Sequence, residues 1–308
     1  NPIAGQIWYN STSATLKGEV EAGVGEGTWA AGGSLSTARN PSGAMSGIQT
    51  AALNISGPYS GSVDNVEQYN GTSWTEIADV NAPRENAMSS SSGPATATLF
   101  VAGNGPGAVT YCEQFNGTSW TEVNDVNTAR GQGAGVGTEA AALVFGGVGP
   151  WYTAITEDYN GTSWTEVADL NLARANLSSF GIQALAFGVG GRAPGTPTIK
   201  ANVESWNGTS WTETTEANTA KSEASGSGVT TAGLFYGGAA PPGNTATTEY
   251  WNGSSWTELA DLATAGSRIS CNMGASSTAT IVPLQASPSL TTEEWNVPDT
   301  TTVTITTS

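Results

Sequence analysis

A motif of twelve residues recurs five times along the chain and constrains its fold more than any other feature. The first copy reads YNGTSWTEIADV, and the copies occupy 69–80, 115–126, 159–170, 206–217 and 251–262. The tryptophans of the motif are 46, 44, 47 and 45 residues apart, and a further tryptophan lies 45 residues before the first; the six are Trp29, Trp74, Trp120, Trp164, Trp211 and Trp256. A repeat of this length is typical of one four-stranded blade of a β-propeller.

Each repeat contains the signals of four short strands. The second strand is an apolar run that ends in glycine, as in ALVFGG at 142–147 and GLFYGG at 233–238, and short runs of this kind indicate strands buried on both faces. Asn-Gly between an aromatic residue and Trp then predicts a hairpin between the third and fourth strands. We expect positive φ at both central positions of that turn, because Asn and Gly tolerate it.

The repeat resembles that of the Kelch-type β-propellers, which carries Gly-Gly after a hydrophobic strand, then an aromatic residue, then Trp. The best matches are Gly146-Gly147 with Tyr159 and Trp164, and Gly237-Gly238 with Trp251 and Trp256. Ser56-Gly57, Ala102-Gly103 and the last unit depart from the pattern. The resemblance covers about 29–296 and implies a propeller.

Six units can be counted from the basic residue that opens each one: Arg39, Arg84, Arg130, Arg174, Lys221 and Arg268. The sixth unit ends at 295–296 without a Trp-Thr-Glu strand of its own, whereas Trp29 supplies a spare strand. We therefore predict an all-β fold, a six-bladed β-propeller of four-stranded antiparallel blades, closed by the N-terminal strand around Trp29. The alternative is that the Thr-rich tail at 300–308 closes the last blade. A closed ring leaves only short outer edges.

The chain ends lie outside the repeat. We expect an N-terminal hairpin and linker for attachment at 1–27, with a strand, a turn at 10–13, a second strand and a flexible stretch at 19–27. The propeller is expected at 28–296, and a Thr-rich C-terminal strand at 297–308 that could add to a neighbouring sheet edge. Because the chain begins with Asn1 rather than Met, we also expect an upstream portion outside this sequence.

Acidic residues also recur in columns. Six precede the aromatic residue of the third strand: Glu67, Glu113, Glu157, Glu204, Glu249 and Glu293. Others follow the tryptophan by two or five positions, as Glu166 and Asp169 do. The six basic residues could form an anion-binding ring around the central channel, but we favour structural ion pairs with one acidic column, because a position repeated in every blade serves every blade. Single carboxylates per turn are weak evidence for Ca²⁺ sites.

Composition excludes several classes of function. Histidine is absent from the 308 residues, which removes imidazole bases, histidine-dependent nucleophiles and the usual zinc and copper sites. The net charge of −17 would repel nucleic acid or an anionic bilayer, and no apolar run approaches the length of a membrane helix. We expect no nucleic-acid partner, membrane insertion, cofactor or metal. Cys112 and Cys271 are expected to be buried apolar residues.

Seven sequons match the glycosylation pattern, and five of them coincide with the Asn-Gly turns. Turn chemistry already explains those five, so we do not expect glycosylation. Among propeller enzymes, the sialidase type lacks its Asp-containing turn here, and a Kelch-like copper oxidase would need histidine ligands. Paired carboxylates for glycoside hydrolysis stay open without a named pair.

The loops between second and third strands differ from blade to blade, and they should share one face with the connections between blades. Variable loops on a rigid scaffold are where recognition usually resides. Their large side chains are Tyr59, Trp151, Tyr152 and Arg192, and these four are our candidate ligand-binding residues, with capping of neighbouring blades as the alternative role.

The stretch at 2–18 resembles the Pro-x-x-Gly-x-x-x-Tyr-Asn segment of bacteriophage tail-fibre and other virion appendage proteins. We therefore expect a non-catalytic propeller on a virion tail or capsid appendage, or a secreted one. It would bind a host-surface glycan or protein through the variable loops and other appendage subunits through 1–27 and 297–308, with a homo-oligomer possible. A purely structural or decoration subunit and a polysaccharide-degrading enzyme are the alternatives.

Overall fold

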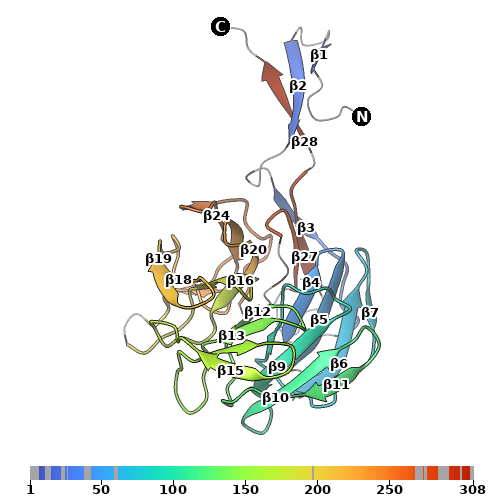
Figure 1. Ribbon diagram of the computed structural model, residues 1–308. Helices are drawn as coiled ribbons and strands as arrows, with labels where there is room; N and C mark the ends of the chain where they lie inside the picture. The colour runs from blue at the N-terminus through green and yellow to red at the C-terminus, as the bar shows by residue number, and fades with distance from the viewer. Residues whose placement is uncertain are drawn as a thin grey trace.

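The computed structural model describes residues 7–10, 15–21, 25, 27–37, 43–58, 62–195, 198–267, 273, 276–283, 291–298 and 300–305. These residues contain no α-helix. Six antiparallel sheets follow one another around a ring, so the chain is a six-bladed β-propeller with a small separate sheet beside it (Figure 1). The predicted fold class is confirmed.

Five blades have four described strands each, ordered from the ring centre outward. Blade 1 consists of β4 (Ala44–Ile48), β5 (Ala51–Pro58), β6 (Ser62–Tyr69) and β7 (Trp74–Glu76). Blade 2 consists of β8 (Met88–Ser89), β9 (Thr98–Asn104), β10 (Ala108–Phe115) and β11 (Trp120–Val123). Blade 3 consists of β12 (Ala134–Gly137), β13 (Ala142–Phe145), β14 (Thr156–Tyr159) and β15 (Trp164–Val167). Blade 4 consists of β16 (Ser178–Ile182), β17 (Leu185–Val189), β18 (Val203–Trp206) and β19 (Trp211–Thr214). Blade 5 consists of β20 (Ser225–Val229), β21 (Ala232–Tyr236), β24 (Thr248–Trp251) and β25 (Trp256–Glu258), with a two-stranded hairpin, β22 (Ala239–Ala240) and β23 (Gly243–Asn244), in its variable loop.

Blade 6 closes the ring with strands from both ends of the chain. Its described strands are β26 (Ala279–Pro283), β27 (Thr292–Asn296) and β3 (Thr28–Ala31), in that order. Trp29 of β3 lies opposite Trp295 of β27, as Trp74 lies opposite Tyr69 in blade 1. On the inner side, Met273 bridges to Ser227 of β20. Closure by the strand around Trp29 is therefore confirmed.

The Thr-rich tail does not take part in the ring. Its strand β28 (Thr300–Ile305) pairs with β2 (Thr15–Glu21), which also pairs with β1 (Ile7–Asn10). These three strands form a sheet beyond β3 and β27 (Figure 1), which we call the stalk. The alternative closure by the tail is wrong, and residues 19–21 belong to a strand rather than to a flexible linker.

The Asn-Gly hairpins form as predicted, but with a different turn. Four residues, Asn-Gly-Thr-Ser or, in blade 5, Asn-Gly-Ser-Ser, join the third and fourth strands, and only the glycine has positive φ, between 88° and 94°. The Asn side chain instead accepts hydrogen bonds from the two backbone N–H groups that follow, as Asn160 Oδ1 does from Thr162 (3.0 Å) and Ser163 (2.9 Å). The expectation of positive φ at Asn was wrong, because Asn serves here through its side chain as an Asx turn.

The glycine pair after the second strand explains why two blades can depart from Gly-Gly. The first position has φ of 64° at Gly146, and Ala102 adopts nearly the same value, 53°. A left-handed residue with a side chain is tolerated there at a cost of about 1–2 kcal/mol. The second position has φ of 108° at Gly147, and a Cβ there would lie 2.7 Å from the carbonyl oxygen of Gly131, so this position remains glycine in the first five blades.

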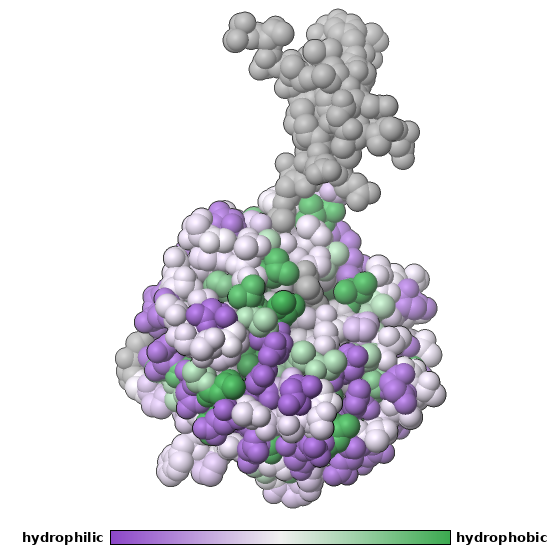
Figure 2. All heavy atoms as spheres, viewed as in Figure 1, coloured by the Kyte–Doolittle hydropathy of each residue, from purple (hydrophilic) through white to green (hydrophobic). Residues whose placement is uncertain are grey.

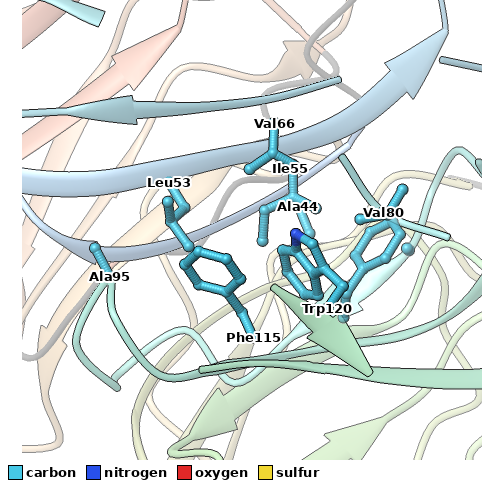
Figure 3. Close-up of a cluster of buried hydrophobic side chains, with 10 residues drawn as sticks. Ala44, Leu53, Ile55, Val66, Val80, Ala95, Phe115 and Trp120 are labelled. Carbon is cyan, nitrogen blue, oxygen red and sulfur yellow. The ribbon is translucent and has the colours of Figure 1, made fainter. Parts of the chain in front are cut away.

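The tryptophan of each outer strand packs against the preceding blade. Figure 3 shows Trp120 and Phe115 of blade 2 against Leu53, Ile55 and Val66 of blade 1. Four of the six indole N–H groups donate to an acceptor on that neighbour; for example, Trp120 donates to the carbonyl of Ala78 (3.0 Å) and Trp211 donates to Thr156 Oγ1 (3.0 Å). The repeated tryptophans thus supply hydrophobic contacts between each blade and the preceding one.

Candidate recognition face

Two faces of the ring differ in what they present. Because strands alternate in direction within a blade, the Asn-Gly turns lie beside the turns between first and second strands: Gly161 is next to Ala140, and Gly71 is next to Thr50. The other face carries the connections between blades and the loops between second and third strands. We call it the variable-loop face, and its loops are 57–65, 103–109, 146–156, 190–202 and 237–248.

The stalk emerges from the face that carries the Asn-Gly turns. In blade 6 the chain enters β3 at Thr28 and leaves β27 at Asn296, and these two residues are paired. They occupy the place that the four-residue Asn-Gly turn takes in the other blades. The stalk and the variable loops therefore lie on opposite faces of the propeller.

The basic residues that open the repeats belong to the scaffold. The four described ones are at most 1% exposed, and each pairs with the glutamate of the third strand in its own blade. The pairs are Arg84–Glu113 (2.6 Å), Arg130–Glu157 (2.5 Å), Arg174–Glu204 (2.9 Å) and Lys221–Glu249 (3.1 Å). The predicted ion pairing is confirmed for these four blades, and burial of these cations argues against an anion-binding ring. Arg39 and Arg268 lie outside the described residues.

The glutamates also fix the connections between blades. All six accept backbone N–H groups from the turn that enters their blade, at 2.6–3.3 Å. Glu157, for example, accepts from Asn127 and Thr128 while it pairs with Arg130. Burial lowers the pKa of Arg84, Arg174 and Lys221, and the partner glutamate opposes that shift.

Trp151 and Tyr152 lie together on the variable-loop face of blade 3. Trp151 is 82% exposed and Tyr152 is 38% exposed, although large aromatic residues are mostly buried in folded proteins. Their loop is short and internally bonded: Gly149 N donates to Trp151 O (3.2 Å), Thr153 N donates to Gly147 O (3.0 Å), and Val148 pairs with Tyr152. The backbone thus holds both rings at the surface.

A pocket of about 240 Å³ lies between this loop and the turn that enters blade 3. Its lining is Thr128, Ala129, Arg130, Gly149, Pro150, Trp151, Tyr152, Thr153 and Ile155. The loop and the turn approach so closely that a Cβ at Gly149 would lie 2.9 Å from the carbonyl oxygen of Ala129. The structure therefore brings two of the four predicted binding residues into one concave site.

Arg192 does not line this pocket. Arg192 lies in the loop of blade 4, where its Nη2 is 3.2 Å from Glu223 Oε1 and its backbone pairs with Ala175 and Ile199. This ion pair connects blade 4 to the turn that enters blade 5, which matches the capping role we considered. Tyr59 lies outside the described residues.

Sequence reasoning missed a ring of polar residues on the variable-loop face. They follow the basic residue by two positions, have φ between 53° and 60°, and are Asn86, Gln132, Asn176 and Glu223. Their backbones bond from blade to blade: Gln132 N donates to Asn86 O (2.8 Å), Asn176 N to Gln132 O (2.6 Å) and Glu223 N to Asn176 O (2.9 Å). The sequence did carry a signal for these residues: a polar residue recurs two positions after the basic one, and in two blades it is Asn, which tolerates left-handed φ.

The inner strands are packed closely with small residues. Ser89 and Ser91 donate from buried hydroxyls to the carbonyls of Met45 and Gly135 in the neighbouring blades. Ser92 reaches across to the carbonyl of Gly181 in blade 4. These hydrogen bonds tie neighbouring blades together at the centre of the ring.

Further features of the surface and interior concern metals, cysteine and membranes. Among the residues that the structure describes, no three His, Cys, Asp or Glu side chains gather as metal ligands, and no helix could cross a membrane. Cys112 is buried, and burial raises the pKa of its thiol to about 12. Asn54, of the sequon at 54–56, is fully buried. On the face shown in Figure 2, apolar groups lie among polar and neutral ones.

Comparison with known proteins adds no relative to this picture. The chain matches no known family model, and no curated protein sequence is significantly similar to it.

Proposed function

We propose that this protein is a non-catalytic recognition module, a Kelch-like propeller carried on a virion tail or capsid appendage or on another extracellular assembly. In this proposal the variable-loop face binds a glycan or protein of a host surface. Segments 1–27 and 297–308 attach the module to other subunits of the appendage.

The observation that carries the proposal is the opposite placement of stalk and variable loops. The stalk replaces the Asn-Gly turn of blade 6, so an assembly attached there would present the variable-loop face outward. That face holds Trp151 and Tyr152 at the surface on a short bonded loop. Exposed aromatic residues on a rigid backbone bind with little loss of conformational freedom, and they are frequent anchors at binding sites.

Adhesion of labelled protein to intact candidate host cells tests this function. We expect saturable binding that extracted surface polysaccharide or surface protein competes away, and that a Trp151→Ala, Tyr152→Ala variant loses. Leu185→Ala is the matched control, because Leu185 is 48% exposed at the turn between the first and second strands of blade 4, on the stalk side. Equal adhesion of both variants would contradict the proposal, and release of reducing ends from a bound polysaccharide would contradict its non-catalytic part.

A structural or decoration subunit is the second candidate, and the stalk favours it. β1 and β28 are the outer strands of a three-stranded sheet, and each has one edge without a partner among the described strands. Open edges of this kind pair readily with other strands. If no cell type binds the protein while removal of 300–308 prevents its incorporation into a larger assembly, this second function replaces the first.

A further inference from the structure

The pocket of blade 3 has walls suited to a flat ring with hydroxyl groups. Trp151, Tyr152 and Pro150 supply ring surfaces, and Ile155 adds an aliphatic one. The polar atoms at the rim are available: among the described residues, no hydrogen bond engages the Trp151 indole N–H, the Tyr152 hydroxyl or the Thr128 hydroxyl. A pyranose ring presents apolar C–H groups on its faces and hydroxyls around its edge, which matches this combination of stacking surface and polar rim.

The pocket offers no free charge to a ligand. Arg130, its only ionisable lining residue other than Tyr152, is fully buried. Its guanidinium donates to Glu157, to the carbonyl of Thr128 (3.0 Å) and to the carbonyl of Gly146 (3.1 Å). A carboxylate or sulfate ligand would therefore meet no unpaired cation here, and the net charge of −17 would oppose its approach.

We propose that this pocket binds one uncharged sugar ring of a neutral glycan, with the ring stacked on Trp151 and its hydroxyls bonded at the rim. The inference rests on the proposed recognition function and names its ligand class. A volume of about 240 Å³ suits a single ring, whereas a protein partner would need a contact surface of roughly 800 Å² on each side. A ring on a flexible glycan chain fits a small concave site without further contacts.

A second pocket, beside blade 2, has a different character. It has about 320 Å³ and is lined by Asn81, Ala82, Tyr111, Glu113 and Glu122. Tyr111 is its one aromatic residue, and the exposed Glu122 gives it an acidic wall, whereas Glu113 is buried and paired with Arg84. Tyr111 is 45% exposed, so Tyr111→Ala removes an exposed aromatic ring without touching the blade 3 pocket.

Saturation-transfer NMR and calorimetry with single sugars test the inference. The probes are the methyl glycosides of glucose, galactose, mannose and N-acetylglucosamine, with methyl glucuronide as the anionic counterpart. We expect saturable binding of at least one neutral glycoside with a dissociation constant on the order of millimolar, and weaker binding of the glucuronide. Trp151→Ala and Tyr152→Ala should each lower the affinity about tenfold or more, a loss of about 1.4 kcal/mol, whereas Tyr111→Ala should leave it unchanged.

The outcomes separate this inference from the function on which it rests. No saturable signal up to about 100 mM of any neutral glycoside, or an unchanged affinity in Trp151→Ala, overturns the sugar pocket. If cell adhesion is nevertheless lost in Trp151→Ala, recognition stands and its ligand is a protein. If a neutral glycoside binds at Trp151 and no cell is bound, the pocket stands and host recognition fails. Because Trp151 is 82% exposed, its variant is expected to fold, and thermal unfolding checks this.

Discussion

Blade 3 and blade 6 have the same register between their third and fourth strands, but they join those strands differently. In blade 3 an Asx turn of four residues leads from Tyr159 to Trp164. In blade 6 the fourth strand comes from the other end of the chain, and Trp29 faces Trp295. Local pairing costs little loop-closure entropy, whereas pairing across most of the chain must overcome more of it. A regular blade can therefore form through its local turn. The closing blade depends instead on side-chain contacts across the seam, by which we mean blade 6 and its contacts with blades 5 and 1.

Several such contacts lie at the seam. The ring of Trp29 lies 4.9 Å from that of Tyr236, with the two planes tilted by 59°, and its indole N–H donates to Thr248 Oγ1 of blade 5. On the other side, Gln49 Nε2 of blade 1 donates to the carbonyl of Trp295 (3.0 Å) and to Asn296 Oδ1 (2.9 Å). Blade 6 is thus tied to both neighbours near the point where the chain enters and leaves the ring.

Removal of residues 1–36 should have the largest effect. This deletion takes away β3 and leaves blade 6 without its outer strand, so we expect loss of the cooperative thermal transition or a fall of its midpoint by more than 10 °C, roughly 5 kcal/mol for a domain of this size. The matched control removes only the stalk, residues 1–24 together with 299–308, and should keep the wild-type midpoint within about 2 °C. An unchanged midpoint after the first deletion would show that β3 does not close the ring.

Loss of one buried carboxylate should have the next largest effect. Glu157→Gln leaves Arg130 charged and unpaired in the interior of blade 3, and breaking a buried pair in this way costs about 3–5 kcal/mol. Glu166→Gln is the control, because Glu166 lies opposite Glu157 in the same blade and is exposed, so we expect a change within about 0.5 kcal/mol. Urea unfolding measures both.

A double variant shows whether the loss comes from the unpaired charge. Arg130→Met combined with Glu157→Gln removes both charges, while the amide oxygen of the introduced glutamine can still accept from Asn127 or Thr128. We expect the double variant to be more stable than Glu157→Gln alone. If Glu157→Gln costs less than about 1 kcal/mol, regular blades do not depend on the ion pair, and local connection alone holds them.

The scaffold could be predicted from the sequence because every blade uses similar residues at the same positions for the same contacts. The spacing of the tryptophans, the spare strand at Trp29 and the match of basic and acidic columns all follow from residues that do the same work in every blade. Their repetition makes the role visible without an alignment. The turn at Asn160 was predicted for a partly wrong reason, since the same sequence serves an Asx turn as well as a two-residue hairpin.

The site could be predicted less well from the sequence, because it depends on which loop and which turn are neighbours in space. Trp151 and Arg192 are both large residues in variable loops, yet one is exposed over a pocket and the other is paired with Glu223. The residues of the neighbouring turn decide this difference, and the repeat pattern of the sequence does not show how that turn packs against the loop. The second wall of the pocket, Thr128, belongs to a connection between blades that looked purely structural.

Trp29→Ala measures how much the seam contributes beyond simple burial. Trp29 is only half-buried, so loss of its ring should cost about 2 kcal/mol. Trp164→Ala is the reference in a regular blade, where the ring is 6% exposed and lies 4.8 Å from Tyr159, and it should cost about 3–5 kcal/mol. Urea unfolding of both variants ranks them, and a cost at Trp29 equal to that at Trp164 would mean that closure adds stability that burial does not explain.

Tyr69→Phe should have the smallest effect, and that effect depends on pH. The hydroxyl of Tyr69 in blade 1 donates to Glu294 of blade 6, and burial, followed by this hydrogen bond, raises the pKa of Tyr69 to about 12. The folded pKa lies above the unfolded value of about 10, so the stabilisation is complete below pH 10 and is lost as the pH rises toward 12. We expect the variant to be about 1 kcal/mol less stable than wild type at pH 8, with a difference that shrinks above pH 10. Tyr159→Phe is the control in a regular blade, since no described carboxylate accepts from that hydroxyl. Urea unfolding between pH 8 and 11.5 follows both variants; a constant difference at Tyr69 across this range would show that its hydrogen bond does not hold the seam.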